Sequence, residues 1–281
     1  ISSAASDVYK RQAVVSGWIL YYFVKFLTGQ NQDFGFEKMI TTPSVNVTYL
    51  LFTLLIAFVI LSFHLQGGLE RITKYMMSAL IVLMLVLAVH SFTLPGAGEG
   101  LSFYLIPHFS KITGSVVVGA MNQAFFTLSV GMGGMAIFGS YIGKDRSLMG
   151  ESIHIIILDT LVAVIAGIII FPACFTYDVE VTAGPSLLFD TMATVFNNMA
   201  GGRWWGTLFF LFMVFAAMST VLGVCENILA MVRELTGWSR PVGCIVCGVG
   251  TFLLALTTAL GFSVIHFQPL SLIHISEPTR H

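Results

Sequence analysis

Long apolar stretches alternate with short polar ones along the chain. About seven of the stretches are long enough to cross the hydrocarbon core of a bilayer, which needs roughly 17 to 25 residues of helix. They lie near residues 13–29, 44–64, 75–94, 115–140, 152–175, 204–233 and 241–265. The pattern therefore predicts an all-α fold, a polytopic membrane helix bundle with about seven transmembrane helices.

Composition agrees with this pattern. The chain is 56% hydrophobic and only 10% charged, which is typical of an integral membrane protein. Its net charge of −1 gives no electrostatic reason to expect a nucleic-acid partner. The four cysteines lie in or at the edge of apolar segments. We interpret them, including the Cys244 and Cys247 pair, as small packing residues rather than a metal or redox site.

The distribution of lysine and arginine predicts the orientation. Cytoplasmic loops of membrane proteins are enriched in these residues. Three alternate loops carry two basic residues each, and the other loops carry one each. The richer loops contain Arg71 and Lys74, Lys144 and Arg146, and Arg233 and Arg240, and the poorer ones contain Lys38, Lys111 and Arg203. The first apolar segment should therefore run outward in a multi-pass cell membrane protein, here expected in a bacterial inner membrane.

The most informative segment is residues 122–135, inside the fourth apolar stretch. It carries Gln123, Thr127 and Ser129, followed by the glycines of the sequence VGMGGM. Lipid does not tolerate unsatisfied backbone unless that backbone is buried in protein or lines a cavity. The segment therefore predicts a helix broken at mid-membrane, as secondary transporters use to build substrate and ion sites.

Two neighbouring segments also carry polar groups inside apolar sequence. Asp159 and Glu226 are the two acids well inside such segments, and Ser219 and Thr220 lie near the middle of the sixth. A carboxylate within the membrane is costly and usually marks an ion pathway. Carbonyls, hydroxyls and a carboxylate are the ligands that a hard cation prefers.

Several motifs occur in an order and spacing that resemble one family. They are FFTLSVGMGGMAIFGSY, VVSGWILYYFVKFL, GGLERITKYMM, GLSFYLIPHF, AGIIIFPACF, AGPSLLF and FFLFMVFAAMSTVLGVCEN, and together they span about Ala13 to Phe267. The chain resembles the neurotransmitter:sodium symporters, which include bacterial leucine-transporter-like proteins. The resemblance implies an inverted-repeat fold, of which this chain covers about helices three to nine. It also implies sodium-coupled symport of an amino acid or related amine by alternating access, and no enzymatic activity.

The resemblance implies two sodium sites and no organic cofactor. Thr127 and Asp159 match ligands of the first site. Ala216, Ser219 and Thr220 match the carbonyl and two hydroxyls of the second. Ala163 stands where chloride-dependent relatives carry a serine, and Asp159 brings a negative charge of its own. Chloride is therefore not expected to be required.

The resemblance also implies an amino-acid pocket and an inner gate. The matching substrate residues are Phe126, Thr127, Ser129, Met132, Thr220 and Val224. Phe126 would act as a lid, and Met132 would form a flexible apolar wall. Tyr141 and Glu234 match positions of the inner gate. The partners expected are the substrate and the lipid bilayer.

Both ends of the chain differ from the membrane segments that they flank. Residues 1–12 and 269–281 resemble junction or adapter sequence, which is set aside when a fold is predicted. Residues 13–268 are then expected to be a fragment of the symporter's transmembrane domain that does not transport alone. The loop from Thr176 to Arg203 should form an outer lid of two short helices.

Other functions are also compatible with parts of the pattern. Polar breaks at mid-depth build the selectivity filters of channels, although only one broken segment is visible. A non-transporting membrane protein on the same scaffold is a further alternative. An intramembrane enzyme using Ser129, Thr127 and Asp159 would need a histidine at matching depth, a GxSxG motif or a metal pair, and the sequence has none of these.

Overall fold

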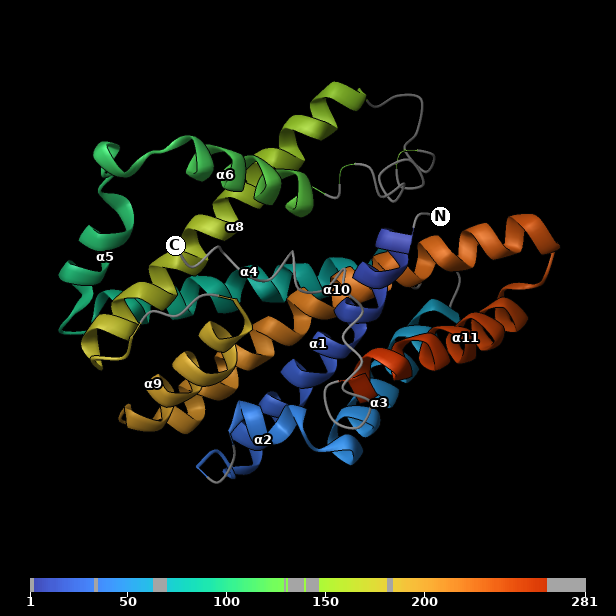
Figure 1. The fold of residues 1–281 in the computed structure, drawn as a ribbon, viewed down its shortest axis with the longest axis horizontal. Helices are drawn as coiled ribbons and strands as arrows, with labels where there is room; N and C mark the ends of the chain where they lie inside the picture. Colours follow the sequence, from blue (N-terminus) through green and yellow to red (C-terminus); the bar gives the residue numbers. More distant parts are fainter. Residues whose placement is uncertain are drawn as a thin grey trace. The chain divides into compact units, whose positions relative to one another are not determined.

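A computed structural model describes residues 3–32, 35–62, 70–128, 130, 139, 147–180 and 184–261 (Figure 1). These residues form helices and connecting turns, with no strand among them, so the all-α prediction is confirmed. The helices are α1 (Ser3–Thr28), α2 (Phe36–Ile40), α3 (Pro43–Ser62), α4 (Glu70–Phe92), α5 (Ala97–Leu105), η2 (Phe109–Lys111), α6 (Gly114–Thr127), α8 (Leu148–Thr176), η3 (Leu187–Thr191), α9 (Met192–Asn198), α10 (Gly202–Thr236) and α11 (Arg240–Gly261).

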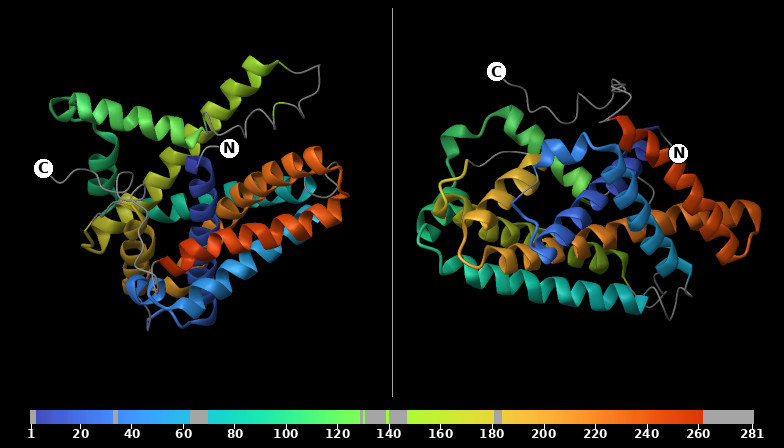
Figure 2. Two further views of the ribbon diagram at one scale, coloured as in Figure 1. Left: turned by 45° about the vertical axis from the view of Figure 1, so that its right-hand side comes forward. Right: turned by 90° about the horizontal axis from the view of Figure 1, so that it is seen from below.

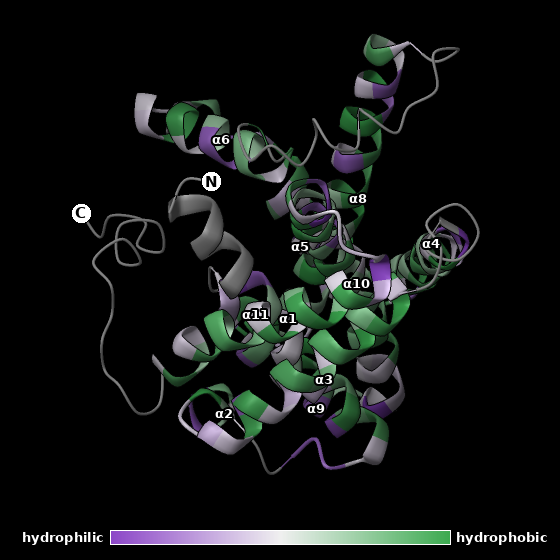
Figure 3. Cartoon of the chain, turned by 90° about the vertical axis from the view of Figure 1, so that its right-hand side faces the viewer, coloured by the Kyte–Doolittle hydropathy of each residue, from purple (hydrophilic) through white to green (hydrophobic). Residues whose placement is uncertain are grey.

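Five of the described helices are long and apolar enough to cross a membrane: α3, α4, α8, α10 and α11. Hydrophobic residues predominate along these helices (Figure 3). The described part of α6 has 14 residues, which is too short to span. The first helix, α1, begins at Ser3, within the stretch expected to be junction sequence, and continues unbroken to Thr28. The assignment of residues 1–12 stays a prediction, and residues 269–281 lie outside the described residues.

The chain divides into two compact units. Residues 1–83 and 179–281 form the first unit, in which α1 packs against α3, α10 and α11 (Figure 2). Its centre is aromatic. The ring of Phe26 stacks on Phe210 with centroids 5.1 Å apart, and Tyr22 packs on Phe210 at 5.2 Å. These three side chains are fully buried, so contacts between rings fix how α1 lies on α10.

A buried amide, that of Asn46, joins α1, α2 and α3. The indole Nε1–H of Trp18 donates to Oδ1 of Asn46 at 2.8 Å. The Asn46 amide in turn donates to the carbonyl of Ile40, at the end of α2, at 2.7 Å. Asn46 is almost completely buried in α3, and these partners remove the cost of burying its polar atoms.

The expected outer lid is a single helical run. A π-helical turn, η3, is followed directly by α9, so residues 187–198 do not form the two separate short helices that were predicted. A π turn widens the helix without ending it. Its Phe189 ring stacks on Phe36 of α2 with centroids 5.0 Å apart and planes 6° from parallel. This stack attaches the run to α2.

Residues 84–178 form the second unit, in which α5 packs closely on α8. Glycine allows this approach. A Cβ built on Gly100 would lie 2.6 Å from Cα of Pro172, and one built on Gly167 would overlap the Tyr104 ring. The Tyr104 ring also stacks on Phe171, with centroids 4.7 Å apart. Small residues at such contacts are the usual way in which membrane helices approach one another.

Pro172 lies inside α8, where it removes a backbone donor. Proline has no N–H, so the carbonyl of Ile168 loses the partner that an uninterrupted helix would provide. The hydroxyl of Ser91, near the end of α4, donates to that carbonyl at 2.9 Å. Ser91 is buried, and its hydroxyl provides in the apolar interior a partner that water would provide elsewhere.

We expect Ser91→Ala to destabilise the protein by about 1 to 2 kcal/mol, because the Ile168 carbonyl is then left unsatisfied. Pro172→Ala restores the N–H that this carbonyl lacks. Thermal or denaturant unfolding in detergent should therefore show a smaller cost of Ser91→Ala in the Pro172→Ala background. Equal costs in the two backgrounds would show that Ser91 does not compensate for the proline.

Candidate functional site

The longest described helix, α10, carries all the predicted site residues of the first unit. It lies between two glycines in the left-handed region, Gly201 (φ 71°) and Gly237 (φ 70°). Such glycines commonly end helices, and the N–H of Gly237 donates to the carbonyl of Arg233 at 2.8 Å. The helix runs for 35 residues without a proline, so its midpoint lies near Ser219.

Three predicted ligands of the second sodium site meet on one turn at this midpoint. The hydroxyl of Ser219 donates to the carbonyl of Ala216 at 2.8 Å, and the hydroxyl of Thr220 donates to the same carbonyl at 3.2 Å. Both hydroxyl oxygens keep their lone pairs for another partner. Three oxygens therefore lie together halfway along an apolar helix, and they are of the type that a hard cation binds.

Two further predicted residues lie on α10. Val224 follows Thr220 by four residues, so the two share a face of the helix, where Val224 is half-buried. Glu234, the gate candidate, is exposed in the last turn. The helix thus brings the substrate candidate close to the oxygen cluster and leaves the gate candidate at its end.

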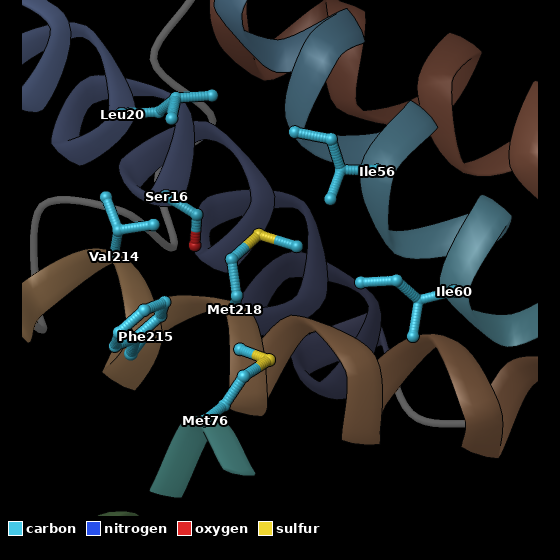
Figure 4. A pocket seen from close by; sticks show the side chains of 8 residues that line it. All are labelled: Ser16, Leu20, Ile56, Ile60, Met76, Val214, Phe215 and Met218. Atoms are coloured by element: carbon cyan, nitrogen blue, oxygen red, sulfur yellow. The ribbon is translucent and has the colours of Figure 1, made fainter. Parts of the chain in front are cut away.

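An apolar cavity of about 210 Å³ lies beside the same stretch of α10 (Figure 4). Val214, Phe215 and Met218 line it from α10, together with side chains of α1, α3 and α4. Its single polar side chain is Ser16, whose hydroxyl already donates to the Gln12 carbonyl at 2.7 Å. One side-chain oxygen cannot replace the hydration shell of a cation. The oxygen cluster, and not this cavity, is therefore the candidate sodium site of the first unit.

The second unit carries the remaining described candidates. Phe126 and Thr127 occupy the last turn of α6, and both are exposed. The Thr127 hydroxyl accepts a hydrogen bond from the Gln123 amide at 3.3 Å. After Thr127 the regular pattern ends, and the N–H of Val130 donates to the Phe125 carbonyl at 3.0 Å. Ser129, Met132 and Tyr141, and with them the predicted mid-membrane break, lie outside the described residues.

Asp159 lies on α8, 11 residues after Leu148, and is partly exposed. Within the described part of the chain its carboxylate makes no ion pair or hydrogen bond. Phe126, Thr127 and Asp159 thus belong to the second unit, whereas Ala216, Ser219, Thr220, Val224 and Glu234 belong to the first. The residues that the structure brings together are those of the second sodium site.

Sequence reasoning left Glu226 without a role, and the structure gives it a partner. The guanidinium of Arg240, at the start of α11, binds both carboxylate oxygens of Glu226, at 3.2 and 2.7 Å. Its Nε–H donates to the carbonyl of Leu61 in α3 at 2.7 Å. One arginine therefore joins α3, α10 and α11. The sequence marked Glu226 as an acid inside an apolar segment and Arg240 only as a basic loop residue, and no local pattern pairs residues on different helices.

A second acid lies in the lid, outside the membrane-spanning helices. Loss of hydration raises the pKa of Asp190 above its ordinary value of 3.8, and the nearby charge of Glu37 raises it further. A hydrogen bond from the Phe36 backbone lowers the pKa by a smaller amount. Asp190 therefore links η3 to the first turn of α2.

Comparisons with known proteins agree with the residues described above. A model of the sodium:neurotransmitter symporter family matches residues 4–270. Uncharacterized sodium-dependent transporters of Haemophilus influenzae and Bacillus subtilis are each 31% identical, over 88% and 90% of this chain. The sodium- and chloride-dependent glycine transporter 2 of Xenopus laevis is 25% identical over 82% of it. The crystal structure of MhsT in complex with L-phenylalanine matches with a TM-score of 0.83 and 34% identity, over 95% of this chain.

This chain belongs to the sodium:neurotransmitter symporter family, a family of multi-pass membrane transporters. The predicted resemblance and the predicted fold are confirmed. The chain spans 56% and 58% of the two bacterial relatives and 63% of the MhsT chain.

We expect Arg240→Ala to destabilise the protein by about 3 to 5 kcal/mol, because it leaves the Glu226 carboxylate buried without its partner. Glu226→Leu combined with Arg240→Met removes both charges and should recover most of that loss. Arg233→Ala is the matched control, since among the described residues the hydrogen bond of Arg233 is a long one, 3.4 Å to the Trp238 carbonyl. The free energy of unfolding in detergent should be measured for the Arg240→Ala variant, the double variant and the Arg233→Ala control. A double variant as unstable as Arg240→Ala would contradict the assignment.

The raised pKa of Asp190 predicts a pH dependence of the lid. The folded state favours the protonated carboxyl of Asp190. The stability that this carboxyl contributes is therefore complete below the ordinary pKa of 3.8 and is lost as pH rises through the higher pKa of the folded state. Asp190→Asn should remove this dependence and leave the lid more stable at neutral pH. Hydrogen exchange of residues 187–198 across pH 4 to 7 measures the pH dependence of the lid's stability, with Glu180→Gln as the control. An unchanged pH profile in Asp190→Asn would refute the assignment.

Proposed function

We propose that this sequence forms part of a sodium-coupled symporter that carries an amino acid or related amine by alternating access. The observation that carries the proposal is the oxygen cluster at the midpoint of α10. Ser219 and Thr220 place two hydroxyls beside the Ala216 carbonyl, in a helix that is otherwise apolar at this depth. Oxygens at mid-membrane are useful where an ion takes the place of water.

The proposal includes a first sodium site at Thr127 and Asp159. The carboxylate of Asp159 would supply the negative charge, and the Thr127 hydroxyl a neutral oxygen. Transport should then not require chloride, because a charge already present in the protein balances the ion. Support for this is Ala163, which has no side-chain hydroxyl to offer to a chloride ion at the position where chloride-dependent relatives carry a serine.

The substrate class follows from the relatives and the pocket residues. The relatives include a glycine transporter of Xenopus laevis and a serotonin transporter of Drosophila melanogaster, and MhsT was crystallised with L-phenylalanine. An amino acid or an amine derived from one is common to these names. Phe126, Thr127, Ser129, Met132, Thr220 and Val224 would surround it, and the apolar Met132 and Val224 favour an apolar side chain. Tyr141 and Glu234 would belong to the inner gate. The protein would act as a carrier and not as an enzyme.

Sodium titration of uptake tests the proposal. Ser219→Ala combined with Thr220→Ala removes two ligands of one ion, each worth about 1 kcal/mol. In proteoliposomes holding a protein of the relatives' full length that contains this sequence, the sodium concentration for half-maximal uptake should rise roughly tenfold or more. Thr207→Ala is the matched control, since its hydroxyl bonds to the Arg203 carbonyl of the same helix at 2.7 Å.

Two results would contradict the proposal. An unchanged sodium requirement in the double variant would make these hydroxyls packing groups only, whose role is to bond to the preceding turn. Sodium current that does not depend on an amino acid and does not saturate would indicate the channel alternative. Accumulation of a labelled amino acid against its gradient, lost when sodium is replaced by potassium, is the expected outcome.

A further inference from the structure

One polar side chain on the expected cytoplasmic half of α10 has no role in the site described above. It is Asn227, which directly follows Glu226. Its amide oxygen Oδ1 is buried, and none of the described residues donates a hydrogen bond to it. Buried acceptors in native proteins nearly always have a donor. The oxygen of Asn227 therefore requires an explanation.

The surroundings of Asn227 supply no structural partner for this oxygen. The guanidinium of Arg240 binds the Glu226 carboxylate and the Leu61 carbonyl instead. Helices outside this sequence cannot reach the oxygen in this conformation, because atoms of the chain already cover it. The residues one turn away on the same face of α10 have no side-chain donor, and they are Gly223, Val224, Ala230 and Met231.

The position of Asn227 along α10 relates it to the oxygen cluster. Asn227 follows Thr220 by seven residues, so the two lie on the same face about two turns apart, or roughly 10 Å along the axis. The helix ends nine residues later, at Thr236, on the expected cytoplasmic side. Asn227 thus lies about halfway between the cluster and that end.

The stretch of α10 between these points is otherwise apolar. Among its side chains between Thr220 and Arg233, Glu226 and Asn227 alone carry oxygen or nitrogen. The carboxylate of Glu226 is already bound by Arg240. The amide oxygen of Asn227 is therefore the one side-chain oxygen of α10 in this stretch that keeps its lone pairs for an ion.

A sodium ion that leaves the cluster towards the cytoplasm has to pass this stretch. A cation in apolar surroundings is costly unless oxygens replace the water that it loses. An amide carbonyl oxygen is a ligand that hard cations accept. We propose that Oδ1 of Asn227 is a transient ligand of the sodium ion on its way between the second site and the cytoplasm. This inference rests on the proposed sodium-coupled function.

The energetics of the amide agree with such a role. A buried acceptor without a donor lowers the stability of the conformation that contains it. Polar groups that break a local rule in this way are expected at functional sites. The oxygen is covered here, and opening of the cytoplasmic half during alternating access would bring it into contact with the ion and water. The amide then disfavours the closed conformation alone.

Stability measurements separate this role from a structural one. Asn227→Leu keeps the approximate size of the side chain and removes both polar atoms. Because no hydrogen bond to the oxygen is lost, the free energy of unfolding in detergent should equal or exceed that of the wild type. Asn227→Ala provides the same comparison with a smaller side chain. A lower stability in both variants would show that the amide has a structural partner, and would overturn the proposal.

Transport measurements test the ligand itself, in proteoliposomes holding a protein of the relatives' full length that contains this sequence. Asn227→Leu should leave equilibrium binding of radiolabelled sodium unchanged, because Asn227 does not belong to the bound site. The maximal velocity of amino-acid uptake should fall severalfold. Asn227→Asp keeps an oxygen at the same position and should restore most of that velocity. Thr236→Ala is the matched control, since its hydroxyl bonds to the Val232 carbonyl of the same helix at 2.7 Å.

The possible failures can be distinguished. If the wild-type protein accumulates no amino acid in a sodium gradient, the proposed function fails, and the role of Asn227 fails with it. If the wild type transports and Asn227→Leu retains its velocity, the role of Asn227 alone is refuted. Weaker equilibrium sodium binding in Asn227→Leu, or an Asn227→Asp variant as slow as Asn227→Leu, would also contradict a transient oxygen ligand.

Discussion

The constraint on which the structure depends is that lipid supplies no hydrogen bonds to the backbone. Each feature that interrupts a regular helix therefore needs an internal partner. At Pro172 that partner is the Ser91 hydroxyl, and at the end of α3 the Arg240 guanidinium reaches the Leu61 carbonyl. At Ser219 and Thr220 the hydroxyls donate to the Ala216 carbonyl and keep lone pairs for a further partner, and the proposed sodium site uses these oxygens.

Periodicity and composition predicted the helices well because long apolar runs leave few alternatives. Five of the predicted spans appear with closely similar ends. The lid was harder to predict. The sequence and the family resemblance predicted two short helices, whereas a π turn joins η3 to α9. The packing of Phe189 on Phe36 holds that turn, and this contact between distant segments has no local signature.

The candidate site was predictable where it depends on one helix. Ala216, Ser219 and Thr220 are three and four residues apart, so a helix alone brings their oxygens together. The pairing of Glu226 with Arg240 depends instead on how α10 lies against α11, which is fixed by side-chain packing along both helices. The roles of Thr127 and Asp159 came from family resemblance, and they remain predictions.

The contact between Ser91 and the Ile168 carbonyl has a consequence for biosynthesis. The donor precedes the proline by about 80 residues, so α4 has left the ribosome before α8 is complete. When Pro172 enters the bilayer, the hydroxyl that satisfies the exposed carbonyl is already in place. The order of the two residues along the chain means that this weak point of α8 need never be exposed to lipid alone. A permuted chain that places α8 ahead of α4 would lose that protection during insertion.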